Sequence, residues 1–188
     1  MKETNITPMM QECTRQLLKD EVYLNMVKEV AKLSKDKNTH IGALIVAQDG
    51  TPVSWGYNGA VSGFNDAMIP HSREKETLTY CIRNHDTGIT KEIEFEANKY
   101  PFMSHAESNA IFFADKTKLA GSTIYVTGFP CENCAREIAR AKIARVVIKT
   151  VKVDKGSTLN DDNNTAMYEF ANANVDLTID GKNYTIRV

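Results

Sequence analysis

Two short segments constrain this chain more than any other feature, because their side chains can act together only in a fold that brings them together. The sequence has His-Ala-Glu at 105–107 and Pro-Cys-Glu-Asn-Cys at 130–134. His105, Cys131 and Cys134 offer one nitrogen and two sulfur ligands, which suit a zinc ion. A catalytic zinc site uses three protein ligands and leaves the fourth position to water. The pattern therefore predicts one catalytic zinc ion per chain.

Glu107 completes the predicted site. It lies too close to His105 along the chain to be a good fourth ligand. A carboxylate beside a zinc-activated water can instead take a proton from the water and pass it to a leaving group. We therefore expect Glu107 to be the catalytic acid and base.

Other interpretations of the cysteine pair remain open. A redox dithiol has the same Cys-x-x-Cys spacing but would need neither His105 nor Glu107. A structural zinc site would need a fourth ligand, such as Cys81 or His85. A buried histidine with unrelated cysteines is a third interpretation. The order of the two segments favours the catalytic site, because it resembles the signature of zinc-dependent nucleobase deaminases.

Composition limits the class of protein. The chain has 188 residues, 42% of them hydrophobic and 25% charged, which fits one globular domain over 1–188. The net charge of -1 argues against a nucleic-acid partner or an anionic membrane surface. Residues 1–13 lack the apolar run of a signal peptide, and no stretch reaches the ~18 apolar residues of a membrane helix. We therefore expect a cytoplasmic protein.

The order of helical and strand patterns predicts an α/β fold. Residues 1–10 should be flexible, and a hairpin should follow the first helix. The expected helices are 12–33, 105–115 (capped by Ser104), 130–144 (beginning at Pro130) and 161–172; the expected strands are 41–46, 52–57, 123–127, 146–151, 175–179 and 184–188. Such alternation predicts a mixed central sheet with helices on both faces. Right-handed crossovers would bring the starts of the two motif helices to one edge of the sheet.

A long polar connection between the hairpin and the first motif has no clear pattern. Connections of such length are uncommon unless they are functional or disordered. We expect residues 74–98 to form a flap on the substrate side, with some helix of its own.

Several further segments resemble deoxycytidylate (dCMP) deaminases of the cytidine deaminase superfamily. They stand in the family's order and cover roughly residues 30–66 and 99–150: Ser-Lys-Asp-Lys-Asn-Thr-His-Ile-Gly-Ala-Leu-Ile-Val at 34–46, Gly-Tyr-Asn-Gly at 56–59, Lys-Tyr-Pro at 99–101, Asn-Ala-Ile at 109–111, Tyr-Val-Thr at 125–127 and Phe-Pro-Cys at 129–131. His-Ala-Glu and Pro-Cys-x-x-Cys mark the whole superfamily. The segments at 34–46 and 56–59 indicate dCMP deaminases in particular.

The resemblance implies a three-layer α/β/α sandwich and zinc-dependent hydrolysis of dCMP to dUMP and ammonia, a step in pyrimidine nucleotide biosynthesis that feeds thymidylate synthesis. It also implies a homo-oligomer, commonly a hexamer, and allosteric effectors dCTP and dTTP. By motif match, His105, Cys131 and Cys134 become the zinc ligands and Glu107 the proton shuttle. Asn58 becomes a contact to sugar or base.

Most of the remaining candidate contacts have two interpretations. The segment Gly56, Tyr57, Asn58 and Gly59 could bind an effector instead of substrate. The backbone amide of Ala106 is a candidate donor to the base carbonyl. Phe129 could stack on the base or simply pack in the core. Lys35 and Arg73 are candidate phosphate contacts or ordinary surface residues.

The sequence departs from the family in two places, and other functions share its core. Residues 74–98 form an insertion relative to the family pattern, and residues 152–164 match no family segment. Alternative functions are deamination of dCTP or of 5-substituted dCMP, and deamination of a base in tRNA or single-stranded DNA. A catalytically silent nucleotide sensor is a further alternative. The near-neutral charge speaks against the polynucleotide substrate.

Overall fold

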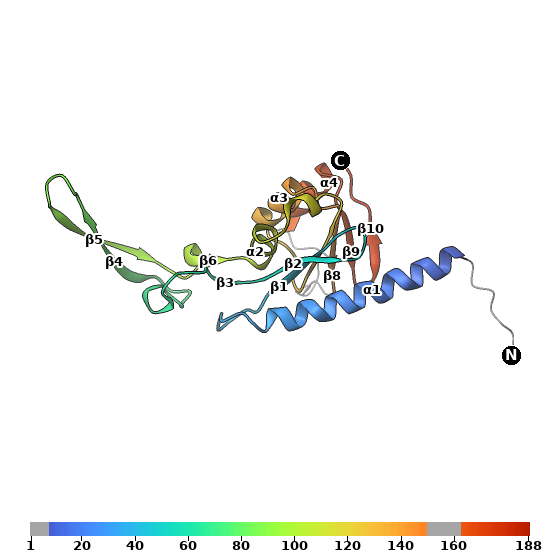
Figure 1. Cartoon of the computed structure of the whole chain (residues 1–188), viewed down its shortest axis with the longest axis horizontal. Helices are drawn as coiled ribbons and strands as arrows, with labels where there is room; N and C mark the ends of the chain where they lie inside the picture. Colours follow the sequence, from blue (N-terminus) through green and yellow to red (C-terminus); the bar gives the residue numbers. More distant parts are fainter. Residues whose placement is uncertain (1–7, 150–162) are drawn as a thin grey trace. The chain divides into compact units, whose positions relative to one another are not determined.

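The computed structural model of the protein describes residues 8–149 and 163–188 (Figure 1). Within these residues the chain forms two compact units. The first comprises the chain up to residue 58 and from residue 105 onward, and the second comprises 59–104. A single domain over 1–188 therefore stays a prediction, and the second unit is described by itself below. No helix of the described chain has the length and apolar character needed to cross a membrane.

The first unit is built on one mixed sheet. Among the described residues, six strands pair in the order β10-β9-β8-β7-β1-β2. Their bounds are β1 Gly42–Val46, β2 Pro52–Tyr57, β7 Thr123–Val126, β8 Arg145–Ile148, β9 Asp176–Ile179 and β10 Lys182–Tyr184. The β7, β8 and β9 strands run parallel, whereas β1 is antiparallel to both β2 and β7. The predicted hairpin and mixed sheet are confirmed.

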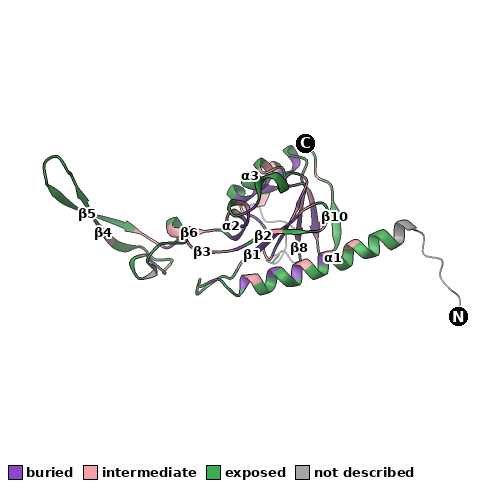
Figure 2. Cartoon of the chain, in the orientation of Figure 1, coloured by how far each residue is buried: buried purple, intermediate pink, exposed green. Residues whose placement is uncertain are grey.

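Helices cover both faces of this sheet, as predicted. The helices are α1 Pro8–Ala31, α2 Ala106–Phe112, α3 Glu132–Arg140 and α4 Asn164–Asn172. Alternate side chains of a strand point to opposite faces. Leu44 and Tyr125 accordingly pack with Val27 of α1, while Ile45 and Ile124 pack in the core beneath α2, α3 and α4. Buried strands between these helices give the three-layer α/β/α sandwich (Figure 2).

Two glycines let the helices approach the sheet closely. A Cβ atom at Gly42 would lie 2.5 Å from the carbonyl oxygen of Val27 in α1. A Cβ atom at Gly56 would lie 2.3 Å from the carbonyl oxygen of Ala106 in α2. Neither glycine has a positive φ angle, so space rather than backbone conformation requires them. Gly56 therefore has a packing role beside the first motif.

A buried carboxylate attaches α1 to the sheet. Asp20 accepts hydrogen bonds from the hydroxyl of Tyr125, at 2.8 Å, and from Nε2 of Gln16, at 2.9 Å. It also forms an ion pair with the guanidinium of Arg145 on β8. Burial and the hydrogen bond to Asp20 raise the pKa of Tyr125, so this tyrosine remains a donor. A charged residue inside the apolar face of α1 is stable here because it is fully paired.

Several element ends differ from the expected ones. His105 caps α2 in place of Ser104, and Cys131 caps α3, which begins two residues later than the predicted Pro130. Both capping residues have extended backbone, and neither side chain makes a capping hydrogen bond. The last strand, β10, ends at Tyr184 where we expected one to begin, and α1 is already helical at Pro8. The expected elements at 150–151 and 161–162 and part of the segment 152–164 lie outside the described residues.

The second unit contains a long β-hairpin where we expected residues 74–98 to form a flap with some helix. Strands β4 Glu76–Arg83 and β5 Thr90–Ala97 pair antiparallel over their whole length. The Asn84 side chain accepts two backbone hydrogen bonds in the turn, and Gly88 has a φ of 69°. The helix expectation was wrong because β-branched and aromatic side chains alternate along both strands. Short strands β3 Gly59–Ala60 and β6 Met103–Ser104 also pair, and single 3-10 turns lie at Asp66–Met68 and Tyr100–Phe102.

Candidate metal and catalytic site

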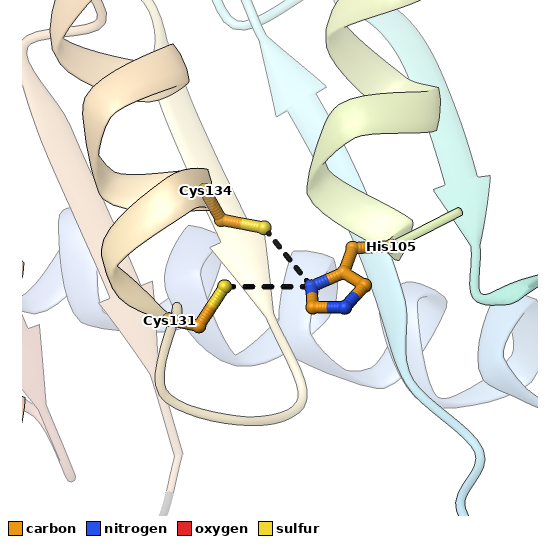
Figure 3. A group of neighbouring side chains, drawn as sticks. All are labelled: His105, Cys131 and Cys134. Carbon is orange, nitrogen blue, oxygen red and sulfur yellow. Dashed lines mark hydrogen bonds between the residues drawn. The ribbon is translucent and has the colours of Figure 1, made fainter. Parts of the chain in front are cut away.

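The two motif segments meet at the starts of two neighbouring helices. His105 is the capping residue of α2, Cys131 is the capping residue of α3, and Cys134 lies in the first turn of α3. Figure 3 shows the three side chains pointing toward one another. His105 Nδ1 lies 3.5 Å from Cys131 Sγ and 3.3 Å from Cys134 Sγ. The structure thus brings together the three residues that the sequence singled out.

The spacing of these donors fits one metal ion. All three ligand atoms lie within 4.8 Å of one another. In a tetrahedral zinc site with Zn–S near 2.3 Å and Zn–N near 2.05 Å, nitrogen and sulfur lie about 3.6 Å apart. The separations of 3.3 and 3.5 Å are close to that value. Among the described residues the group contains neither Cys81 nor His85, the fourth ligands that a structural site would have required.

The two thiols differ in the direction of their pKa shifts. Hydrogen bonds from Cys134 and His105 lower the pKa of Cys131 to about 3. The hydrogen bond to Cys131 and burial raise the pKa of Cys134 above its ordinary value. The hydrogen bond to Cys131 also raises the pKa of His105. A divalent cation displaces such protons and binds both sulfurs as thiolates, so the donor set suits zinc.

Glu107 lies in the first turn of α2 and is 4% exposed. Burial raises the pKa of its carboxyl group, and its own backbone hydrogen bond and the charge of His105 oppose that rise in part. A carboxyl group with a raised pKa can hold and release a proton near neutral pH. Glu107 is two residues after His105 in the chain and forms a side-chain hydrogen bond with Cys134, so it lies beside the donor group.

The predicted substrate or effector segment is held by backbone contacts. Asn58 Oδ1 accepts a hydrogen bond from the Ile41 amide at 2.8 Å, and Asn58 Nδ2 donates to the Thr39 carbonyl at 2.9 Å. The Tyr57 carbonyl accepts a hydrogen bond from Asn109 Nδ2 at 2.8 Å. This part of the segment therefore links β2 to the chain before β1 and to α2. Its contacts to substrate or effector, including those of Gly56 and Gly59, stay predictions.

The other candidate contacts are spread over the molecule. Ala106 is completely buried at the start of α2. Phe129 packs against the core, with its ring 6.4 Å from that of Phe170, which is the packing alternative. Lys35 is exposed in the first unit, and Arg73 is exposed in the second. The roles of Ala106, Lys35 and Arg73 toward a substrate stay predictions.

One contact between the motif helices was not predicted. Ser108 Oγ on α2 donates a hydrogen bond to Glu137 Oε2 on α3 at 2.6 Å. Ser108 follows Glu107 directly, and Glu137 lies one turn after Cys134. The bond therefore joins the two helices that carry the three donors. No sequence signal could identify it, because it depends on the rotation of each helix about its axis.

Comparison with known proteins relates the chain to zinc-dependent deaminases. Residues 18–150 match the family model described as the cytidine and deoxycytidylate deaminase zinc-binding region. The zinc-binding description and the His/Cys/Cys group agree that the cofactor is zinc.

Two relatives of known name are deoxycytidylate deaminases. The chain is 36% identical to deoxycytidylate deaminase of Homo sapiens over 122 residues, which is 65% of this chain and 59% of that protein. It is 30% identical to deoxycytidylate deaminase of Mycobacterium phage D29 over 128 residues, 68% of this chain and 91% of the relative. The chain thus spans about three fifths of the human protein's length.

The fold is similar to a solved structure described as dCMP deaminase from the cyanophage S-TIM5 in complex with dCMP and dUMP. The TM-score is 0.54 at 22% sequence identity, and the match covers 85% of this chain and 94% of that chain.

Proposed function

Because the chain belongs to the family of cytidine and deoxycytidylate deaminases, we propose that it hydrolyses dCMP to dUMP and ammonia. In this reaction the bond between C4 of the cytosine and its amino nitrogen breaks, and a bond forms between C4 and the oxygen of water. The observation that carries the proposal is the group of three metal donors with a buried carboxyl group beside it. The names of the relatives support dCMP as the substrate.

We assign the ligand role to His105, Cys131 and Cys134. Their spacing and the lowered pKa of Cys131 support this assignment. When bound, zinc supplies the Lewis-acid chemistry that makes water a nucleophile at neutral pH. The three residues would hold the ion, and a catalytic zinc site with three protein ligands would keep a further position for water.

Glu107 moves the protons. Its carboxylate accepts a proton from the attacking water and delivers it to N3 of the base, which makes C4 more electrophilic. It next takes the remaining proton from the hydroxyl group now on C4 and delivers it to the amino nitrogen; the C4–N bond breaks, C4 becomes a carbonyl, and ammonia leaves. Burial in the first turn of α2 supports this role, because it gives the carboxyl group a raised pKa and a fixed position.

The remaining contacts of the proposal concern the substrate. The Ala106 amide is a donor to the base carbonyl, and Asn58 contacts the sugar or the base. Lys35 and Arg73 are the cations that neutralise the phosphate. Ala106 and Asn58 lie in segments that adjoin the donor group, which supports their proposed contacts to the substrate. The proposed phosphate contacts of Lys35 and Arg73 are supported by their charge alone.

The wider role follows from the substrate. An enzyme that makes dUMP belongs to pyrimidine metabolism and supplies thymidylate synthesis in the cytoplasm. As in the family that the sequence resembles, we propose a homohexamer and regulation by dCTP and dTTP through residues 56–59. Nucleic acid and membranes are not expected partners.

The test is ammonia release from dCMP by wild-type protein loaded with zinc and by the Glu107→Gln variant. We expect the variant to lose about 10²- to 10⁴-fold in turnover while its zinc content stays at one ion per chain. Glu132→Gln is the matched control, because Glu132 is an exposed acid next to Cys131 and should keep full activity. Near-normal turnover by Glu107→Gln would refute the role of Glu107. Activity on cytidine, dCTP or single-stranded DNA but not on dCMP would refute the substrate.

A further inference from the structure

The hairpin of the second unit has one apolar face. Leu78 pairs with Phe95 and Tyr80 pairs with Ile93 across the two strands, and directly paired residues point to the same face. The rings of Tyr80 and Phe95 lie 5.9 Å apart, edge to face, which confirms that they share it. Together with Ile82, which pairs with Lys91, these residues form what we call the apolar face of the hairpin.

This face is uncovered in the single chain. Tyr80 is 48% exposed, Ile82 is 53% exposed and Phe95 is 40% exposed. Figure 2 shows that both strands of the hairpin are mostly exposed. A two-stranded ribbon is at best marginally stable in water by itself, and it gains stability when an apolar face packs against another layer. The apolar face therefore needs a second surface to cover it.

The opposite face of the hairpin is polar and acidic. It carries Thr77, Thr79, Cys81 and Arg83 on β4, which pair with Glu96, Glu94, Glu92 and Thr90 on β5, so three carboxylates outnumber one cation. Three carboxylates in a row disfavour stacking through this face, because two such faces would repel each other. Any assembly through the hairpin therefore uses the apolar face and ends once that face is covered.

Charges at the two ends of the apolar face are of opposite sign. Glu76 lies at the end where the hairpin joins the rest of the unit, and Lys91 lies near the turn. When two copies pack face to face with the turn of one over the base of the other, Glu76 of each copy comes to the end where Lys91 of the other copy lies. When both turns lie at the same end, like charges meet instead. The face is thus complementary to itself in the first arrangement.

We propose that this face binds the same face of a second copy of the chain, with the turn of each hairpin over the base of the other. Two packed sheets lie about 10 Å apart, so long side chains such as those of Glu76 and Lys91 can meet at both ends. Two ribbons of this length bury on the order of 800 Å² in total, which is less than the roughly 1,200–2,000 Å² of stable interfaces and fits a weak, transient contact. The resulting dimer contact is reversible and uses none of the three metal donors.

The first test compares two lysine substitutions on neighbouring residues of β4 that point to opposite faces. In sedimentation velocity over a range of concentrations, Tyr80→Lys should weaken the self-association of the wild-type protein at least about tenfold. Thr79→Lys should leave it unchanged, and both variants should keep wild-type deaminase activity. If wild type and Tyr80→Lys sediment as species of equal mass at every concentration, the proposal is wrong. This outcome would show that the face does not bind a second copy, either because it stays exposed or because another part of the same chain covers it.

The second test separates the contact from simple unfolding of the hairpin. At low salt, Glu76→Lys and Lys91→Glu should each weaken self-association, since each places like charges at both ends. The double variant should restore it, because the charges are then exchanged in both copies. Failure of the double variant to recover association would overturn the arrangement with turns at opposite ends. Loss of activity in the Glu107→Gln variant has no bearing on either result.

Discussion

Replacing Gly56 with alanine should displace the metal donors, although Gly56 is not itself a metal donor. The new methyl carbon would lie 2.3 Å from the Ala106 carbonyl oxygen and 2.5 Å from the Ala110 amide nitrogen. Both are backbone atoms of α2, so no side chain can rotate away to make room. The helix must move from β2 as a body, and it carries His105 at its start and Glu107 in its first turn.

The size of the effect follows from the required movement. Favourable contacts between heavy atoms begin near 3.5 Å, so α2 must shift by about 1 Å. Overpacking of this kind costs about 1–3 kcal/mol in the free energy of unfolding, or about 3–10 °C in Tm for a chain of this length. Metal–ligand distances tolerate only about 0.2 Å. We therefore expect Gly56→Ala to weaken zinc binding by about 10- to 100-fold, the range found for changes that misplace ligands.

Gly42→Ala is the matched control for this prediction. Its methyl carbon would lie 2.5 Å from the Val27 carbonyl oxygen and 2.8 Å from the Ala31 amide nitrogen, on the opposite face of the sheet. It should lower Tm by a similar amount but displace α1 rather than α2. Competition with a chromophoric chelator measures the zinc affinity of both variants, and thermal unfolding measures their stability. If both variants lose stability and bind zinc equally well, Gly56 does not position the donors.

Three other substitutions test separate parts of the structure. Cys134→Ser should abolish retention of zinc on dialysis, as measured by metal analysis, whereas Cys81→Ser on the exposed hairpin should retain it; equal zinc contents would contradict the ligand assignment. Asp20→Asn should lower the free energy of unfolding in urea by about 3 kcal/mol, because it leaves a partly buried guanidinium unpaired. Glu29→Gln is the control, because the ion pair of Glu29 with Lys32 is exposed, and it should lower the free energy of unfolding by less than about 1 kcal/mol. Equal losses of unfolding free energy in the two variants would refute this account of Asp20. Ser108→Ala removes the hydrogen bond from α2 to α3 and should speed zinc transfer to a chelator about tenfold; an unchanged rate would show that the bond does not hold the donors together.

The fold class and the grouping of the three metal donors could be predicted from the sequence. Continuous apolar runs such as 42–46 predict strands covered on both sides, and β1 is buried at every position. Metal chemistry is carried by residue type and spacing, so His105, Cys131 and Cys134 could be grouped from the sequence alone. Their convergence needs only that two helices begin at the same edge of the sheet.

Interactions that depend on three-dimensional register could not be predicted. Asp20 resembles any polar residue of an amphipathic helix, yet it is buried because Tyr125 and Arg145 lie opposite it. Both ends of the Asn58 amide bind the backbone, which the motif match did not indicate, and the contact of Asn58 to the substrate stays a prediction. The hairpin at 76–97 was expected to contain some helix because its polar residues conceal an alternation that becomes clear only with the strand pairing.

The position of α2 shows why a ligand motif alone does not make a metal site. This helix has seven residues, too few to be stable by itself, so its place must come from contacts with its neighbours. Three contacts define that place: Gly56 lets it approach β2, Asn109 binds the Tyr57 carbonyl, and Ser108 binds Glu137 on α3. Two of them fix α2 to the sheet, and the third fixes it to the helix that carries both cysteines. Since His105 is the capping residue of α2, its distance from the two sulfurs is set by these contacts rather than by the motif. Changes at Gly56 and Ser108 should therefore alter zinc affinity although neither residue is proposed to bind the metal.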